Sequence, residues 1–285
     1  MSLSLSARLR RRVAMRLWPP AFEPPASEPP PPAWATYVGD GLATAHNSDF
    51  LADERFQRAY AAGKATGSWW DYEIHWRAYV VCWAARRGLS ISGDYVECGV
   101  FRGGYSRMLA DYADLGARPD KKLYLIDTYC GVPKHHISPG HEPMLETLYP
   151  DSHADVVATF ADLPNAVVVR GEIPDVLPEV RPESVCYLSI DLNCVEPSIS
   201  AVEHFWPLMS TGAAMVLDDY GFTVFRDQKV AFDAWAARHG LDILTLPTGQ
   251  GLLIKPPAGT GSDLSHSSPS DEPNAGAAGH GVPAT

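Results

Sequence analysis

The chain is organised around one segment, Tyr95-Val96-Glu97-Cys98-Gly99-Val100-Phe101-Arg102-Gly103-Gly104. Its first residues are typical of a short buried strand, and its glycines indicate a tight turn that leads into a helix. Apolar residues then recur at helical spacing, at Tyr105, Met108, Leu109, Tyr112 and Leu115. The pattern predicts a strand at 94–98 and a helix at 104–115. Open α/β sheets bind ligands at the carboxyl ends of their strands, so Glu97 and the turn predict a binding site. We also expect the start of the helix to offer free N–H groups to an anion.

From residue 94 onward, strand-like segments alternate with helix-like segments. The predicted strands are 94–98, 122–126, 166–170, 185–190, 213–217, 242–246 and 250–254, and the other predicted helices are 151–161, 197–208 and 226–239. Several strands are continuous apolar runs, as expected for strands covered on both faces. The alternation predicts an α/β, doubly wound, Rossmann-like and mostly parallel sheet. Because Pro247-Thr248-Gly249 separates the last two strands, we expect them to form a hairpin at one edge.

The remaining segments divide the chain into four parts. Residues 1–35 form a basic, proline-rich arm that we expect to be disordered, and 257–285 form a low-complexity tail. Residues 36–92 predict an N-terminal helical cap, and 93–256 the α/β domain. The cap carries Trp69, Trp70, Trp76 and Trp83, which we expect to pack it against the sheet, with the lining of a substrate pocket as the alternative. In the last helix, Val230, Ala234 and Trp235 are expected to face inward.

Composition narrows the classes of partner. The net charge of −11 argues against nucleic acid as a partner. No apolar run is long enough to cross a membrane, so we expect no stable membrane insertion. The five cysteines show no Cys-x-x-Cys and no zinc-site spacing, which indicates buried thiols in a reducing compartment and hence a cytoplasmic location.

Acidic residues follow several predicted strands. Asp127 ends the second strand, where a carboxylate accepts ribose hydroxyls in nucleotide-binding α/β folds. Asp191 ends the fourth strand, and Asp218 and Asp219 end the fifth. These two strands are expected to be neighbours, so the three carboxylates should converge and repel unless a cation lies between them. Oxygen ligands suit a hard ion, and the sequence therefore predicts a Mg²⁺ site.

The turn itself resembles a known cofactor-binding motif. A dinucleotide fingerprint would need glycine at position 101, where Phe101 stands. The spacing Glu97-x-Gly99-x-x-x-Gly103 instead resembles the first motif of class I S-adenosylmethionine-dependent methyltransferases. In those enzymes the acidic residue and the glycines hold the aminocarboxypropyl end of the cofactor.

Four motifs in order extend the resemblance over about 94–255. They are Val-Glu-Cys-Gly-Val-Phe-Arg-Gly-Gly, Ile-Asp-Thr-Tyr-Cys-Gly-Val-Pro, Ile-Asp-Leu-Asn-Cys-Val-Glu-Pro-Ser and Leu-Asp-Asp-Tyr-Gly. Together they resemble the macrocin O-methyltransferase family, whose members are class I enzymes that methylate sugar hydroxyls of natural products and require Mg²⁺. The resemblance implies a seven-stranded sheet with one reversed strand. It also implies that the partner is a small molecule with a hydroxyl acceptor, and it leaves assembly into a homo-oligomer open.

The resemblance also implies roles for individual residues. Cofactor contacts are expected at Glu97, Gly99, Gly103 and Asp127, and we add Phe101, Gly104, Gly171 and Glu172 at the same edge of the sheet. Metal ligands are expected at Asp191, Asp218 and Asp219. The catalytic set is expected to be Asp191, Asn193, Glu196 and His136.

One position departs from the family. The second aspartate of its Asp-x-Asp pattern is the proposed general base, and this chain has Asn193 there, which cannot take a proton. Replacement bases are His135, His136 or His141 in the loop 129–150, or Glu196, and water is a further acceptor if the metal acidifies the substrate enough. Asn193 also motivates an alternative, a catalytically lapsed cofactor-binding or scaffold protein. A nicotinamide-dependent oxidoreductase is a third, less favoured reading.

Overall fold

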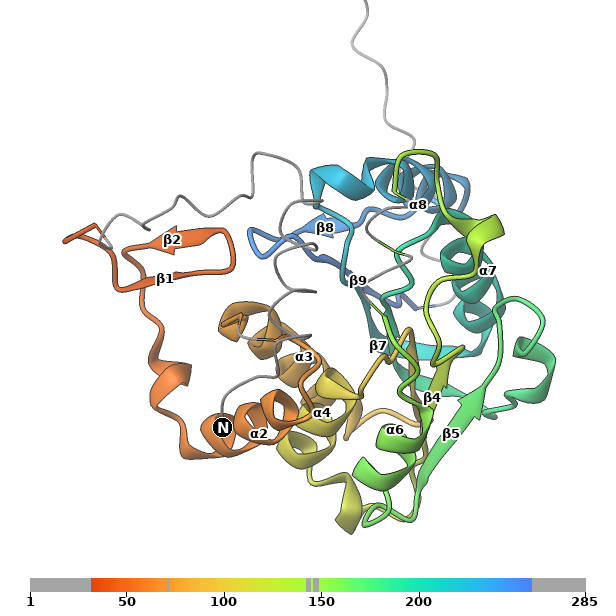
Figure 1. The fold of residues 1–285 in the computed structure, drawn as a ribbon, viewed down its shortest axis with the longest axis horizontal. Coiled ribbons are helices and arrows are strands. Elements are labelled where there is room, and N and C mark those ends of the chain that lie inside the picture. The colour runs from red at the N-terminus through yellow and green to blue at the C-terminus, as the bar shows by residue number, and fades with distance from the viewer. Residues whose placement is uncertain (1–31, 71, 142–144, 146–148, 258–285) are drawn as a thin grey trace, which may run out of the picture.

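The computed structural model describes residues 32–70, 72–141, 145 and 149–257. Most of the predicted arm at 1–35 and nearly all of the predicted tail at 257–285 lie outside these ranges. Seven strands form the central sheet in the order β5-β4-β3-β6-β7-β9-β8 (Figure 1). Their bounds are Asp94–Cys98 (β3), Leu123–Asp127 (β4), Ala166–Arg170 (β5), Val185–Ile190 (β6), Met209–Leu217 (β7), Leu244–Thr245 (β8) and Gly251–Ile254 (β9).

Strands β3 to β7 pair in parallel, whereas β9 pairs antiparallel with both β7 and β8. This confirms the predicted α/β, mostly parallel sheet with a closing hairpin and one reversed strand. The longer helices are Glu54–Ala65 (α2), His75–Gly88 (α3), Gly104–Ala113 (α4), His153–Thr159 (α6), Val195–Phe205 (α7) and Arg226–Arg238 (α8). None of the helices in the described ranges has both the length and the apolar character needed to span a bilayer.

The alternation of side chains along β3 divides the interior into two cores. Tyr95 packs with residues of α2, α3 and α4, whereas Val96 and Cys98 pack with residues of α7 and α8. Figure 1 shows these two groups of helices on opposite sides of the sheet. Because successive side chains of a strand point to opposite faces, one apolar segment serves both cores. The cap helices α2 and α3 thus share the first of these two cores with the sheet.

The cap also contains an element that we did not predict. A hairpin of Tyr37–Gly39 (β1) and Leu42–Thr44 (β2) turns at Asp40 and Gly41, both in the left-handed region with φ of 53° and 73°. Asp-Gly is a preferred pair for such a two-residue turn, so the sequence carried a signal for it. The hairpin places Asp40 against Arg77 of α3, with 2.6 Å between Oδ2 of Asp40 and Nε of Arg77. Arg77 also contacts Asp218 at the carboxyl end of β7, so the hairpin turn lies near that edge of the sheet.

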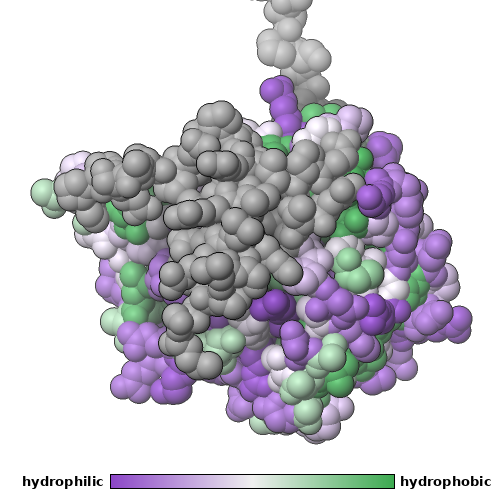
Figure 2. Space-filling model, in the orientation of Figure 1, coloured by the Kyte–Doolittle hydropathy of each residue, from purple (hydrophilic) through white to green (hydrophobic). Residues whose placement is uncertain are grey.

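Two expectations about inward-facing residues were wrong. In α8, Val230 is 60% exposed and Ala234 is exposed, whereas Phe232, Trp235 and Ala236 are buried. Residues 232, 235 and 236 follow the three- and four-residue spacing of a single helix face, and 230 falls outside it. In α3, Trp83 is 43% exposed and faces away from the core. Figure 2 shows apolar residues scattered among polar ones over the described surface that is visible on that face.

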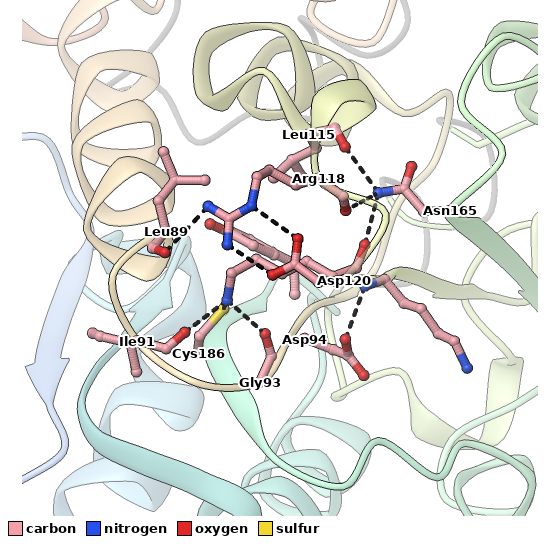
Figure 3. A network of polar contacts seen from close by, with 12 residues as sticks. Leu89, Ile91, Gly93, Asp94, Leu115, Arg118, Asp120, Asn165 and Cys186 are labelled. Atoms are coloured by element: carbon pink, nitrogen blue, oxygen red, sulfur yellow. Dashed lines mark hydrogen bonds and ion pairs between the residues drawn. The ribbon is translucent and has the colours of Figure 1, made fainter.

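The amino ends of the strands are closed by polar contacts within the chain (Figure 3). Lys121 is 3% exposed, and its Nζ donates to the carbonyl oxygens of Ile91 and Gly93 at 2.6 and 2.9 Å. The side-chain amide of Asn165 donates to three further carbonyls, those of Leu115, Arg118 and Lys121. Lys121 and the amide nitrogen of Asn165 thus bind backbone carbonyls of the chain itself, which indicates a structural role for this edge.

Candidate active site

A cavity lies at the carboxyl ends of β3, β4, β6 and β7, beneath the cap. Twelve of the fourteen predicted site residues line it, including Glu97, Gly99, Phe101, Gly104, Asp127, Gly171, Glu172, Asp191, Asn193 and His136. Asp218 and Asp219 line it as well. Gly103 and Glu196 are not among the lining residues. The structure therefore brings the strand ends of the sequence motifs to one place, as the parallel topology requires.

The turn after β3 approaches the neighbouring strand closely at Gly99. This residue has φ of 89°, and a Cβ on it would lie 1.8 Å from the carbonyl oxygen of Asp191. Only glycine fits such a contact in this conformation. Gly103, with φ of 81°, instead forms the N-cap of α4. The packing of the turn against the end of β6 therefore requires glycine at position 99.

The N–H groups of this turn are more fully paired than we expected. The Oδ2 atom of Asp127 accepts from the backbone N–H of Val100 and of Phe101, at 2.6 and 2.8 Å. The N–H of Gly104 donates to Oγ of Ser68 at 2.9 Å. The expectation that the start of the helix offers free donors to an anion is therefore wrong for these three groups. Asp127 fixes the turn, and its proposed contact with ribose stays a prediction.

Glu97 lies at the floor of the cavity and is 1% exposed. Its carboxyl accepts a hydrogen bond from Oγ of Ser106 on α4. Burial, and then the nearby charges of Asp218 and Asp127, raise the pKa of Glu97 well above its ordinary value. The protonated form is the one that this environment favours.

The three predicted metal ligands meet at the ends of two adjacent strands. Ile190 of β6 pairs with Leu217 of β7, so the residues that follow them are neighbours. One carboxylate oxygen each from Asp191, Asp218 and Asp219 lies within 4.8 Å of the others. Burial and the charge of Asp218 raise the pKa of Asp219 to about 8, and burial with both neighbours raises the pKa of Asp191. We call this set the carboxylate triad.

The triad fits a hard cation. Oδ2 of Asp219 is buried, and no described group forms a hydrogen bond with it. An unpaired buried carboxylate oxygen is costly, and a divalent ion beside it would satisfy both the charge and the lone pair. The three carboxylate oxygens are close enough to one another to bind the same ion.

Sequence reasoning missed the residues that hold Asp218 in place. Nη1 of Arg77 lies 3.1 Å from Oδ2 of Asp218, while the hydroxyl of Tyr105 and Nε2 of Gln250 each donate to Oδ1 at 3.1 Å. Their positions in the chain range from the cap to the last hairpin, so no local motif joins them. The signal that was present is Arg77 in the middle of the apolar helix pattern of 72–87, away from Arg86 and Arg87 at its end, which indicates a buried charge with a partner.

Two further members of the predicted catalytic set, Asn193 and His136, line the cavity. Asn193 has φ of 57°, a left-handed conformation that asparagine tolerates. His136 has a side chain that is 4% exposed, and its Nδ1 lies 3.1 Å from Oε2 of Glu196. Glu196 is 68% exposed at its side chain, so it reaches the cavity only through His136.

Aromatic side chains also line the cavity. Trp69 and Trp70 of the cap both line the cavity, which supports the pocket-lining alternative for these two. The ring of Trp70 lies 5.9 Å from that of Phe101, which in turn lies 5.1 Å from the ring of Tyr149. Trp76 packs against Phe50 and Tyr79 instead. Trp69 also belongs to the core of the cap helices and the sheet, so the packing expectation is confirmed for it, whereas Trp70 is 41% exposed and fits the pocket-lining alternative.

Comparison with known proteins agrees with this fold and identifies a family. Residues 81–243, more than half of the chain, match the model of the macrocin O-methyltransferase family (TylF). One similar protein is the 8-demethyl-8-(2,3-dimethoxy-alpha-L-rhamnosyl)-tetracenomycin-C 4'-O-methyltransferase of Streptomyces olivaceus, 22% identical over 187 residues that cover 61% of this chain and 70% of that protein.

Two solved structures show the same fold. The O-methyltransferase NovP superposes with a TM-score of 0.60 at 18% identity, over 74% of this chain and all of that one. The calicheamicin methyltransferase CalS11 gives 0.51 at 16% identity, over 73% and 94% of the two chains. The family match, not these distant structures, decides the assignment. The chain belongs to the macrocin O-methyltransferase family and is an S-adenosylmethionine-dependent O-methyltransferase.

Proposed function

We propose that this enzyme methylates a hydroxyl of a sugar, or of a sugar-bearing natural product, with the help of Mg²⁺ bound at the carboxylate triad. The observation that carries the metal is the unpaired, buried Oδ2 of Asp219 beside two other carboxylates. The sugar acceptor is supported by the family description and by the rhamnosyl substrate in the name of the Streptomyces olivaceus relative.

When bound, S-adenosylmethionine supplies a methyl group on a positively charged sulfur, and its transfer forms a C–O bond as the C–S bond breaks, releasing S-adenosylhomocysteine and the hydroxyl proton. Glu97 and the turn at Gly99 would hold the cofactor at the end of β3. Trp70 and Phe101 exclude water from one wall of the cavity, and the cap above them restricts how an acceptor enters.

Asp191, Asp218 and Asp219 would hold the Mg²⁺, which when bound supplies positive charge that lowers the pKa of a nearby hydroxyl. Arg77, Tyr105 and Gln250 keep Asp218 in one orientation. Asn193 can hydrogen-bond to an acceptor but cannot take its proton. Two other side chains that line the cavity can take it, the carboxylate of Asp191 and the imidazole of His136.

The test is a titration of the full-length protein with Mg²⁺ by calorimetry, with and without S-adenosylmethionine. We expect saturable Mg²⁺ binding that Asp219→Asn abolishes. The matched control is Asp242→Asn, which changes an exposed carboxylate that is not among the residues lining the cavity. Equal Mg²⁺ affinity in both variants would refute the metal site.

Turnover is measured separately, on a panel of rhamnosyl and other deoxysugar glycosides, by the mass gain of one methyl group in place of one hydrogen. We expect transfer to at least one sugar hydroxyl and loss of that transfer in the presence of a chelator. Cofactor binding with no transfer to any glycoside, but with transfer to a catechol or another phenol, would refute the sugar acceptor. Cofactor binding without transfer to any acceptor would favour the lapsed-enzyme alternative that Asn193 suggests.

A further inference from the structure

A second cluster of metal-type ligands lies at the wall of the cavity, apart from the carboxylate triad. His135 and His136 come from the short 3-10 helix Lys134–His136 (η4), and Glu172 comes from the loop after β5. One ligand atom of each lies within 4.8 Å of the others. Oε1 of Glu172 is 2.6 Å from Nε2 of His135 and 3.0 Å from Nε2 of His136. Two imidazoles thus converge on a single carboxylate oxygen.

His136 is the most informative member. Its side chain is 4% exposed, and its Nε2 has no hydrogen-bond partner among the described residues, although Oε1 of Glu172 lies 3.0 Å from it. Its other nitrogen, Nδ1, is within 3.1 Å of Oε2 of Glu196. A carboxylate on Nδ1 places the proton there and leaves a lone pair on Nε2. That lone pair then lies close to a carboxylate oxygen, and the two repel unless a cation binds to both.

This arrangement is the one that protein metal sites use. A histidine ligand commonly donates its second ring N–H to a carboxylate, which fixes the tautomer and the ring orientation. Here Glu196 stands in that supporting position, while His135, His136 and Glu172 present two nitrogens and one oxygen. Two imidazoles and a carboxylate suit a first-row divalent ion such as Zn²⁺, whereas the all-oxygen triad suits Mg²⁺.

We propose that Nε2 of His135, Nε2 of His136 and Oε1 of Glu172 bind a first-row divalent transition-metal ion, of which Zn²⁺ is the best match, in a site distinct from the Mg²⁺ site. The ion would tie η4 to the loop after β5 and so fix one wall of the cavity. It would also engage Nε2 of His136, which leaves Asp191 as the proton acceptor. The inference concerns metal binding and holds whether or not the acceptor is a sugar.

The test uses the full-length protein with saturating Mg²⁺, so that the triad is filled. Co²⁺ is added as a coloured substitute for Zn²⁺, and its visible absorption is followed; Zn²⁺ affinity is then measured by competition with a chromophoric chelator. We expect one Co²⁺ per chain, with an absorption that His135→Ala and Glu172→Gln remove. Glu196→Gln should weaken Zn²⁺ binding about 10–100-fold, as the loss of a supporting carboxylate does elsewhere.

Two controls separate this site from general effects. His46→Ala removes an exposed histidine elsewhere and should leave Co²⁺ binding unchanged. Asp219→Asn should lose Mg²⁺ binding but keep the Co²⁺ absorption, so failure of one metal site is distinguishable from failure of the other. The side chain of His135 is 66% exposed, so His135→Ala should remain folded, which circular dichroism confirms.

The alternative is that a proton on Nε2, rather than a metal ion, relieves the contact between His136 and Glu172. In that case wild-type protein would bind no Co²⁺ beyond what His135→Ala also binds, and that result would overturn the proposal. Zn²⁺ should further raise the melting temperature of wild-type protein but not of His135→Ala. An equal rise in both would likewise count against the site.

Discussion

Arg77 of α3 joins Asp218 at the end of β7 to Asp40 in the hairpin turn of the cap. Its Nη1 lies 3.1 Å from Oδ2 of Asp218, and its Nε and Nη2 lie 2.6 and 2.8 Å from the two oxygens of Asp40. The three side chains are at most 17% exposed. One buried cation therefore holds a cap turn against a member of the carboxylate triad, and its charge offsets part of the repulsion there.

Replacing Arg77 with methionine keeps much of its volume and removes its charge. Two buried carboxylates would then lack their partner, so we expect the free energy of unfolding to fall by about 3 kcal/mol. Urea denaturation in the absence of Mg²⁺ measures the change. The matched control is Arg238→Met, because Arg238 pairs with Glu203 at the surface, 3.4 Å away, where the loss should stay below about 1 kcal/mol.

Mg²⁺ should restore part of the stability that Arg77→Met loses, since the ion also neutralises Asp218. Adding Mg²⁺ at saturating concentration should therefore raise the melting temperature of Arg77→Met more than that of wild-type protein. An equal rise in the two proteins would show that Arg77 and the ion act on Asp218 independently.

Gly99→Ala tests the close approach of the turn to β6. The added Cβ would fall 1.8 Å from the carbonyl oxygen of Asp191, so the backbone that carries the first metal ligand would have to move. We expect both a loss of stability larger than the strain of a positive φ alone and a weaker Mg²⁺ affinity. The two quantities are measured by urea denaturation and calorimetry.

Gly41→Ala is the control that isolates the strain. Gly41 also has a positive φ, 73°, but a Cβ there would meet no atom within 4 Å. Its substitution should cost only the conformational penalty of about 1–2 kcal/mol and leave Mg²⁺ affinity unchanged. If the two variants lost stability equally, the contact with the carbonyl oxygen of Asp191 would make no contribution to the stability loss of Gly99→Ala.

The sheet and the triad were predictable because they depend on local patterns. Continuous apolar runs marked the central strands, and parallel pairing then placed Asp191 beside Asp218 and Asp219 without further information. Asp40-Gly41 was an equally local signal for the hairpin, although we did not use it. Where one periodic pattern decides an element, the sequence is sufficient.

The partners of those acids were not predictable in the same way. Arg77 is 141 residues from Asp218 in the chain, and Tyr105 is 113 residues from it. Such contacts depend on how the cap packs on the sheet, which no spacing in the sequence encodes. The same reason explains why Val230 was expected to be buried, since an apolar residue on a helix faces inward only if a neighbour covers it.

Trp70→Ala tests whether the aromatic wall contacts a ligand. Trp70 is 41% exposed and lines the cavity, so its removal should leave the fold nearly as stable and weaken cofactor or acceptor binding. A lost aromatic contact of about 1 kcal/mol corresponds to roughly a fivefold rise in KM. Trp83→Ala is the matched control, because Trp83 is 43% exposed and does not line the cavity. A rise in KM of similar size for both would contradict a specific role for Trp70.

The raised pKa of Glu97 leads us to expect that the stability of the protein depends on pH. Its pKa is raised in the folded protein by burial and by the charges of Asp218 and Asp127, so the native state keeps a proton that the unfolded chain releases near pH 4.5. Between that pH and the folded pKa, the native state binds more protons, and the free energy of unfolding must fall as the pH rises.

Glu97→Gln removes this contribution, because the amide resembles the protonated carboxyl and carries no ionisable proton. In metal-free protein, the free energy of unfolding measured between pH 5 and pH 8 by urea denaturation should therefore decline less steeply for Glu97→Gln than for wild type. Glu183→Gln, which changes an exposed glutamate, should keep the wild-type slope. Parallel slopes for Glu97→Gln and wild type would mean that Glu97 is ionised in the folded protein, and that a cation or an unseen donor near β3 stabilises its charge.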